Sequence, residues 1–274
     1  MPGTLYVVAT PIGNLADASP RALEVLGRVQ VIACEDTRSS RTLLARYGIG
    51  ARTVPLHQHN ERKQSAALLA ALQAGENVAL VSDAGTPGIS DPGALLVALA
   101  HRAGLRVAPV PGPNAAAAAL SASGFPAERY LFAGFLPSAR AARRKALAAL
   151  DSPWPIVFFE APHRVLEMIG DLEARFGGER EVVIARELTK KFEEVARLPL
   201  AAANAWLLEA HRQQGEFVIV LGPGAPREPH AGEGERTLQI LLETLPPGEA
   251  ARLASRITGV ARNALYRKAL QRSK

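Results

Sequence analysis

Residues 4–110 alternate short apolar segments with helical segments, and this alternation constrains the fold more than any other feature of the chain. Helix start and stop signals, such as Ser19-Pro20, Gly48 and Gly75, separate the apolar segments. Strands are predicted at 4–9, 29–34, 52–56, 78–81 and 106–110, and helices at 19–28, 39–47, 60–74 and 91–103. Strands that alternate with helices predict an α/β domain with a mostly parallel sheet covered on both faces, over residues 1–112.

The segment Pro109-Val110-Pro111-Gly112-Pro113 interrupts this alternation, and we expect a second α/β domain over residues 113–223. Its predicted strands are 129–135, 155–160, 181–187, 193–198 and 216–222, and its predicted helices are 114–123, 138–150, 161–176 and 199–213. Some connections are short, so this sheet is expected to be mixed. A Pro/Gly/Glu-rich linker over 224–235 and a small helical tail over 236–274, with helices at 236–245, 249–258 and 260–272, are expected to follow.

The stretch VALVSDAGTPGISDPG, residues 78–93, predicts a ligand-binding loop. An apolar strand ends in Ser82 and Asp83, and a loop rich in Gly, Pro and Asp follows. The next helix is expected to have Asp91 as its N-cap and Pro92 as its first residue. Open α/β sheets bind ligands in the loops at the carboxyl ends of their strands. A tight turn without a ligand is the alternative interpretation.

Several classes of protein are disfavoured by residues that the chain lacks. The single cysteine, Cys34, excludes an internal disulfide and a zinc cluster of cysteines, and His57 and His59 have no evident third metal ligand. No G-x-x-x-x-G-K-[ST] or G-x-G-x-x-G motif is present. No apolar run is long enough to span a membrane, so a cytoplasmic protein without a metal is expected. The net charge of +6 favours an acidic partner such as RNA.

Seven motifs, in order along the chain, resemble one known family. They are ATPIGNL (9–15), CEDTR (34–38), SDAGTPGISDPG (82–93), PGPNA (111–115), FAGFLP (132–137), FFEAPHR (158–164) and ARELTKKFEE (185–194). Together they resemble the ribose 2′-O-methyltransferases of small-subunit ribosomal RNA, a branch of the tetrapyrrole-methylase fold. The resemblance implies S-adenosylmethionine in the cleft between two α/β domains, a homodimer, and methylation of a cytidine ribose in 16S rRNA or the 30S particle. A tetrapyrrole methyltransferase and a non-catalytic RNA-binding assembly factor are the alternatives.

The resemblance also implies the residues that bind the cofactor. The Gly85-Thr86-Pro87 turn and Ile89 would hold its methionine part. The other contacts implied are Asn114, Ala115, Pro11, Phe159, Glu160 and Leu198, although Leu198 stands near a position that is often Gly in the family.

A ribose hydroxyl is a weak nucleophile, so a base or a cation that lowers its pKa would help. Glu35, Asp36 and Arg38 follow the second predicted strand at the sheet edge of the 82–93 loop, and they are the first candidates for catalytic residues. Lys190 and Glu187 are the second. A salt bridge or a helix cap is the alternative role for each of these residues.

Two basic segments are candidates for RNA contacts. Residues 138–145 contain Arg140, Arg143, Arg144 and Lys145 without an acid. Residues 250–274 contain seven basic residues without an acid, among them Arg262, Arg267 and Lys268. Such cationic helix faces suit phosphate contacts that do not read base sequence, and a solvated helix face is the alternative.

Overall fold

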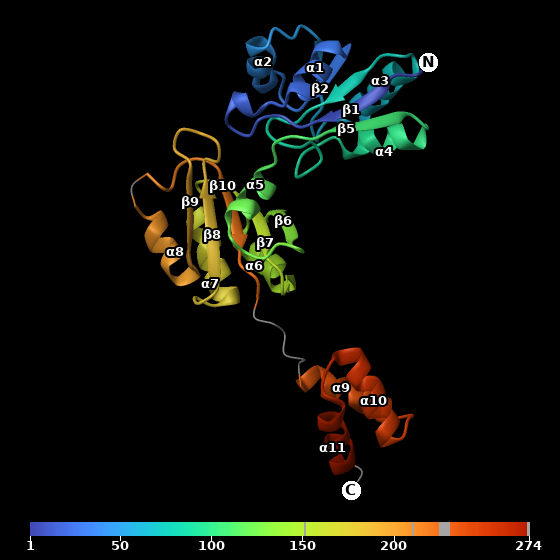
Figure 1. Cartoon of the computed structure of the whole chain (residues 1–274), viewed down its shortest axis with the longest axis vertical. Helices are drawn as coiled ribbons and strands as arrows, with labels where there is room; N and C mark the ends of the chain where they lie inside the picture. Colours follow the sequence, from blue (N-terminus) through green and yellow to red (C-terminus); the bar gives the residue numbers. More distant parts are fainter. Residues whose placement is uncertain (151, 210, 225–230, 273–274) are drawn as a thin grey trace. The chain divides into compact units, whose positions relative to one another are not determined.

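The computed structural model describes residues 1–150, 152–209, 211–224 and 231–272. It contains two compact units, Met1–Pro223 and Gly224–Lys274 (Figure 1). The first unit contains two five-stranded sheets. The first sheet consists of β1 (Thr4–Val8), β2 (Val31–Cys34), β3 (Arg52–Pro55), β4 (Val78–Leu80) and β5 (Arg106–Val110). Its order is β3-β2-β4-β1-β5 and all its neighbours are parallel, which confirms the predicted parallel sheet.

Helices cover both faces of this sheet, as the apolar strands require. Every residue of β2 and β4 is buried, a pattern typical of strands with a core on each side. On one face lie α1 (Pro20–Arg28) and α2 (Thr37–Arg46), which contribute Leu26 and Leu43 to the core. On the other lie α3 (Glu61–Gln73) and α4 (Ala94–Arg102), which contribute Leu68 and Leu96. A short 3₁₀ helix, η1 (Leu15–Asp17), follows β1.

The second sheet is mixed, as predicted. It consists of β6 (Leu131–Phe135), β7 (Ile156–Glu160), β8 (Glu181–Arg186), β9 (Glu194–Pro199) and β10 (Phe217–Leu221). Its order is β6-β7-β10-β8-β9, and only β6 and β7 are parallel. One face packs against α6 (Arg140–Ala149), α7 (Val165–Phe176) and α8 (Leu200–Leu207). The other packs against α5 (Ala115–Ala122), whose small side chains allow close approach to β7 and β10.

Two helices of this second half are shorter than predicted. Helix α7 begins at Val165 rather than at residue 161, because residues 161–164 form a turn closed by the Arg164 N–H to Ala161 carbonyl hydrogen bond. Helix α8 ends at Leu207 rather than near residue 213. The segment after Leu208 is polar, so it has no apolar stripe to bury against the sheet.

The start of α4 differs from the prediction in a way that matters for the site. The helix begins at Ala94 with Gly93 as its N-cap, so Asp91 and Pro92 lie in the preceding loop. The exposed N–H groups at the helix start are satisfied by Glu61 of α3 instead. Its Oε1 accepts hydrogen bonds from Gly93 N at 2.8 Å and from Leu95 N at 3.3 Å. A carboxylate near a helix N-terminus is stabilised by the helix dipole, so Asp91 is not needed as a cap.

The second unit is a three-helix cluster. It consists of α9 (Ala231–Leu242), α10 (Pro247–Thr258) and α11 (Arg262–Arg272). Helix α9 begins before the predicted residue 236, which shortens the expected linker, and residues 225–230 of that linker lie outside the described residues. Leu238, Leu265 and three alanines of α10 form its core. No helix among the described residues is long and apolar enough to cross a membrane.

Candidate functional site

The loops after β1 and β4 are joined by a short antiparallel bridge. Thr10 N donates to the Gly85 carbonyl at 2.8 Å, and Gly85 N donates to the Thr10 carbonyl at 3.0 Å. Gly85 has a φ of +83°, a conformation that other residues adopt only with strain. Thr86 Oγ1 donates to the Pro113 carbonyl at 3.1 Å, which ties the same loop to the start of the second half. The base of the 82–93 loop is therefore bound both to the loop after β1 and to the segment before α5.

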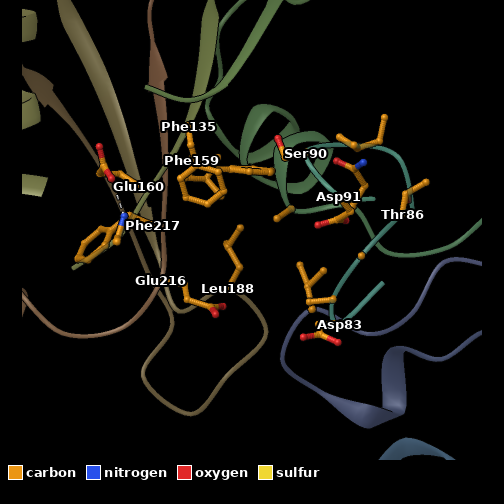
Figure 2. A pocket seen from close by; sticks show the side chains of 18 of the residues that line it. Asp83, Thr86, Ser90, Asp91, Phe135, Phe159, Glu160, Leu188, Glu216 and Phe217 are labelled. Atoms are coloured by element: carbon orange, nitrogen blue, oxygen red, sulfur yellow. Dashed lines mark hydrogen bonds between the residues drawn. The ribbon is translucent and has the colours of Figure 1, made fainter. Parts of the chain in front are cut away.

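A cavity of about 420 Å³ opens beside this loop. Its volume lies within the usual range for small-molecule sites. One wall comes from the first sheet and the other from the second sheet and the start of α5 (Figure 2). Its lining consists of Ile12, Asp83, Ala84, Gly85, Thr86, Ile89, Ser90, Asp91, Asn114, Ala115, Phe135, Phe159, Glu160, Ala161, Pro162, Leu188, Glu216, Phe217 and Val218.

The charged residues in this lining are all acidic. They are Asp83 and Asp91 on one wall and Glu160 and Glu216 on the other, and none of the described lining residues is Lys, Arg or His. The rest of the wall is mainly apolar or aromatic, with the ring of Phe135 5.6 Å from that of Phe159. Carboxylates in a partly apolar cavity favour a cationic ligand, because a cation offsets the cost of removing them from water.

Among the acids of the lining, Asp91 has a strongly shifted pKa. Burial, followed by the negative charges of Glu35 and Asp83, raises the pKa of Asp91 to about 6 from 3.8. The pKa of Glu35 is also raised, by burial and by Asp83. Asp91 points into the cavity from the loop between β4 and α4 (Figure 2). Asp91 therefore lies among negative charges at this wall of the cavity.

Asp91→Asn should stabilise the protein at pH 7.5 but not at pH 3.5. The folded pKa exceeds the unfolded value, so the free energy of unfolding falls as pH rises from about 4 to about 6 and stays lowered above that window. After allowance for solvent screening, the gain at pH 7.5 is about 1–2 kcal/mol. Urea unfolding of both proteins at the two pH values measures it. A variant less stable than the native chain at pH 7.5 would show that the carboxylate makes net favourable contacts.

The first catalytic candidates lie beside the cavity rather than in its wall. Asp36 N donates to Asp83 Oδ1 at 3.0 Å, which places the end of β2 next to the lining. The Asp36 side chain caps α2 and pairs with Arg38 at 2.7 Å, and the Arg38 hydrogen bond lowers the pKa of Asp36 to about 2. Arg38 is exposed and Glu35 is half-buried. For Asp36 and Arg38, the structure therefore shows the cap and ion pair that were the alternative roles.

Lys190 lies in the loop after β8, on the other side of the cavity from Asp36 and Arg38. Its ammonium pairs with Glu187 Oε1 at 2.8 Å and with Glu216 Oε2 at 3.0 Å. Partial burial lowers the pKa of Lys190, but these hydrogen bonds outweigh it and the net direction is upward. Lys190 also lies against the loop after β1, because a Cβ at Gly13 would meet Lys190 Cγ at 2.5 Å. Lys190 therefore braces Glu216, a residue of the lining, without itself lining the cavity.

Seven of the ten residues predicted to bind a cofactor line the cavity: Gly85, Thr86, Ile89, Asn114, Ala115, Phe159 and Glu160. Pro11 lies in a smaller neighbouring cavity, and Pro87 is buried within its loop. Leu198 does not reach the lining, because strand alternation places it on the face of β9 that packs against the α7 and α8 core. Glu160 has a fully buried side chain whose Oε1 lies 3.1 Å from Arg164 Nε.

Three of the four basic residues in the segment 138–145 face two acids of α7, Glu167 and Asp171. Arg143 is fully buried, and it donates to Asp171 at 2.8 Å and to Glu167 at 2.9 Å. Arg144 and Arg140 also face Asp171, at 2.7 Å and 3.6 Å. The prediction that Arg143 contacts RNA is therefore wrong, because its charge is needed to compensate a buried carboxylate. Lys145 is exposed.

Arg143→Met should lower the free energy of unfolding by about 3 kcal/mol, because it leaves Asp171 buried with weaker compensation. Arg140→Met on the same helix is the matched control. The Arg140 side chain is 69% exposed, so its loss should cost under about 1 kcal/mol. Equilibrium urea unfolding compares the two variants, and equal losses would contradict a structural role specific to Arg143.

Arg262 and Arg267 of the tail remain exposed on α11. Lys268 pairs with Glu235 of α9, so its charge is partly neutralised within the unit. Tyr266 and Leu270 are also exposed on α11. Two of the cations predicted on the tail are therefore exposed on α11, whereas Lys268 has an ion-pair partner within the unit.

Sequence reasoning missed Asp91, Glu216, Phe135 and Leu188 as residues of the lining. Asp91 was interpreted as a helix cap. Glu216 immediately precedes β10, which runs antiparallel to β7, so the start of β10 lies beside the end of β7. An antiparallel strand in the middle of a sheet would have had to be recognised from sequence to place Glu216 there.

Comparisons with known proteins identify the family of the chain. Residues 4–204 match the family described as Tetrapyrrole (Corrin/Porphyrin) Methylases. Among solved structures, uroporphyrin-III-C-methyltransferase from Thermus thermophilus superimposes with a TM-score of 0.57 at 20% identity, over 80% of this chain and 94% of that one. Diphthine synthase gives a TM-score of 0.62 at 16% identity, over 80% and 90%. The chain belongs to the tetrapyrrole methylase family.

Closer relatives extend over almost the whole chain. The proteins named "Ribosomal RNA small subunit methyltransferase I" are 51% identical in Pseudomonas aeruginosa, over 98% of both chains, and 49% identical in Escherichia coli O157:H7, over 98% of this chain and 95% of that one. Residues 228–273 match the "RsmI C-terminal HTH domain". The similarity thus includes the helical tail as well as the two sheets.

Proposed function

We propose that this chain is an S-adenosylmethionine-dependent methyltransferase that methylates the 2′-hydroxyl of a cytidine ribose in small-subunit (16S) ribosomal RNA. The observation that carries the proposal is the acid-lined cavity in a chain of the tetrapyrrole methylase family. The name shared by its near-full-length relatives supports the choice of ribosomal RNA over a tetrapyrrole.

The cavity suits this cofactor in size and charge. S-adenosylmethionine carries an ammonium, a sulfonium and a carboxylate, so it is a net cation. The lining offers four carboxylates, of which Glu216 pairs with Lys190 and Glu160 with Arg164. The ion pairs of the described residues leave Asp83 and Asp91 to meet a cationic ligand. We propose that Asp83 and Asp91 face the cationic end and that Phe135 and Phe159 contact the adenine ring. When bound, the cofactor supplies an electrophilic methyl group.

The backbone of the 82–93 loop would hold the methionine part. Gly85 and Gly88 both have positive φ, which turns the loop back on itself beside the cavity. A Cβ at Gly85 would touch Ile12 Cγ2 at an ordinary 3.4 Å, so the positive φ rather than a lack of space favours glycine there. A related solved structure, a uroporphyrin-III C-methyltransferase with a TM-score of 0.54 to this chain, contains S-adenosylhomocysteine. That precedent supports a cofactor of this class in the same fold.

The RNA contacts are proposed on the tail. Helix α11 carries Arg262 and Arg267 at its surface, and the segment matches a helix-turn-helix domain family. Exposed cations suit contacts with the phosphate backbone. We further propose that the substrate is the assembled 30S particle, and that the protein acts as a cytoplasmic homodimer. These last proposals are supported only by the family resemblance.

Incubation of the full chain with methyl-labelled S-adenosylmethionine and unmethylated small ribosomal subunits should place label in 2′-O-methylcytidine. Digestion of the RNA to nucleosides followed by chromatography identifies the labelled product. Calorimetry with S-adenosylhomocysteine checks cofactor binding in the same preparation. Binding without label on ribose would contradict the proposed reaction, and absence of binding would favour an assembly factor.

Charge-removal variants of the full chain locate the RNA contacts in the same assay. Arg262→Ala combined with Arg267→Ala should raise the KM for the particle about ten-fold and leave the affinity for S-adenosylhomocysteine unchanged. The matched control removes Arg102 and Arg106, which are exposed at the amino-end edge of the first sheet, opposite the loops that line the cavity. An equal effect of both double variants would show only a general charge effect.

A further inference from the structure

We propose that Asp91 is the catalytic base of the methyl transfer and accepts the proton of the attacking ribose 2′-hydroxyl. The inference rests on the proposed function, and it replaces the candidates that the sequence suggested. Glu35, Asp36, Arg38 and Lys190 lie outside the cavity lining, whereas Asp91 is part of it.

The start of α4 leaves the Asp91 carboxylate available for this role. An aspartate just before a helix ordinarily accepts hydrogen bonds from the first free N–H groups of that helix. Here Glu61 of α3 accepts the hydrogen bonds from Gly93 and Leu95, and Gly93 itself is the N-cap. Because Glu61, 32 positions before Gly93, accepts these hydrogen bonds, the Asp91 carboxylate is not needed to cap the helix.

The loop backbone then directs Asp91 toward the cavity. Ser90 has a φ of +69°, which is unfavourable for a residue with a side chain, and Gly88 and Gly93 have φ of +80° and +120°. Ser90 lies close to β6, because a Cβ at Gly134 would meet Ser90 Oγ at 2.9 Å. In Figure 2 the Asp91 side chain points into the cavity, between Ser90 above and Asp83 below. Strain of this kind persists where the surrounding structure enforces it, often at functional sites.

The charges around Asp91 suit a base that works near neutral pH. On its own side, Asp91 faces Glu35 after β2 and the Ser82 hydroxyl and Asp83 after β4, while Glu61 of α3 is bound to the nearby Gly93 N–H. Across the cavity, Glu216 is paired with Lys190 and Glu160 with Arg164. The lining carboxylates across the cavity thus have cationic partners, whereas Asp91 and Asp83 form no ion pair with any described residue. A pKa near 6 keeps Asp91 ionised at pH 7.5 yet basic enough to take a proton.

Atoms and charge balance in the proposed methyl transfer. The ribose oxygen forms a bond to the methyl carbon while the bond between that carbon and the sulfonium sulfur breaks. The hydroxyl proton moves to an Asp91 oxygen, and the sulfur leaves as a neutral thioether. Asp91 then returns its proton to water, so no oxidant, reductant or metal is required.

Single-turnover methylation at saturating cofactor, measured from pH 5 to pH 9, tests the role of Asp91. The native rate should rise with pH through one inflection at or below about pH 6 and then remain level. Asp91→Asn should lose 10²- to 10⁴-fold in rate and lose the inflection. Glu216→Gln is the matched control, because it removes one carboxylate from the opposite wall. It should weaken cofactor binding but keep the inflection.

Glu35→Gln provides a second variant in which Asp91 is retained. Removal of the Glu35 charge lowers the pKa of Asp91, so the inflection should move to lower pH while the plateau rate persists. This shift does not depend on whether Asp91→Asn folds. An unmoved inflection would assign the titration to another group.

Calorimetry supplies a readout that does not depend on activity. Binding of the cationic cofactor at pH 6 should release up to about half a proton from Asp91, seen as a dependence of the binding enthalpy on the buffer. Asp91→Asn should release markedly less. S-adenosylhomocysteine, which lacks the sulfonium charge, should release less than S-adenosylmethionine from the native chain.

The outcomes separate this proposal from the proposed function. If the native chain methylates ribose and Asp91→Asn has the native rate and pH profile, Asp91 is not the base. If Asp91→Asn lowers only cofactor affinity and saturating cofactor restores the rate, Asp91 is a binding residue and the proposal is overturned. If the native chain binds cofactor but transfers no methyl group to RNA, the proposed function itself fails.

Discussion

The bridge between Thr10 and Gly85 is the interaction on which the site depends. Two backbone hydrogen bonds join the loops after β1 and β4, and Thr10 Oγ1 adds a third to the Ser82 carbonyl at 3.1 Å. The bridge is possible because β1 and β4 are neighbours in a parallel sheet and Gly85 accepts a positive φ. It fixes the base of the 82–93 loop, and one wall of the cavity follows from that placement.

Cofactor binding and methyl transfer place different demands on the acids around this cavity, and this explains why their environments differ. Carboxylates that neutralise a cationic cofactor increase its affinity, but equal stabilisation of the bound state and the transition state adds nothing to the rate. The rate must come from alignment of the reactants and from removal of the hydroxyl proton. Glu216 and Glu160 are paired with cations, whereas the pKa of Asp91 is raised by burial and, secondarily, by its acidic neighbours. The wall with Glu216 and Glu160 is thereby suited to binding, and the wall with Asp91 to removal of the hydroxyl proton.

The parallel sheet, the mixed sheet and most of the loop contacts could be predicted from local pattern. Strand and helix periodicity is encoded within a few residues, and Gly85 and Asn114 belong to recognisable turns and caps. Asp91 could not be placed, because the cap of α4 comes from Glu61, far away in sequence. Arg143 was interpreted as a surface cation because the acids that neutralise it lie on the following helix. Such errors arise where a side chain has a partner that only the tertiary fold supplies.

The most direct measurement is a crystal structure of the full chain with S-adenosylhomocysteine bound. If the cavity is the methyl-transfer site, the cofactor lies between Gly85 and Phe159 with its sulfur facing Asp91, within about 7 Å of the carboxylate, which leaves space for the methyl group and the attacking oxygen. A cofactor bound outside this cavity, or one whose sulfur faces away from Asp91, would contradict the account.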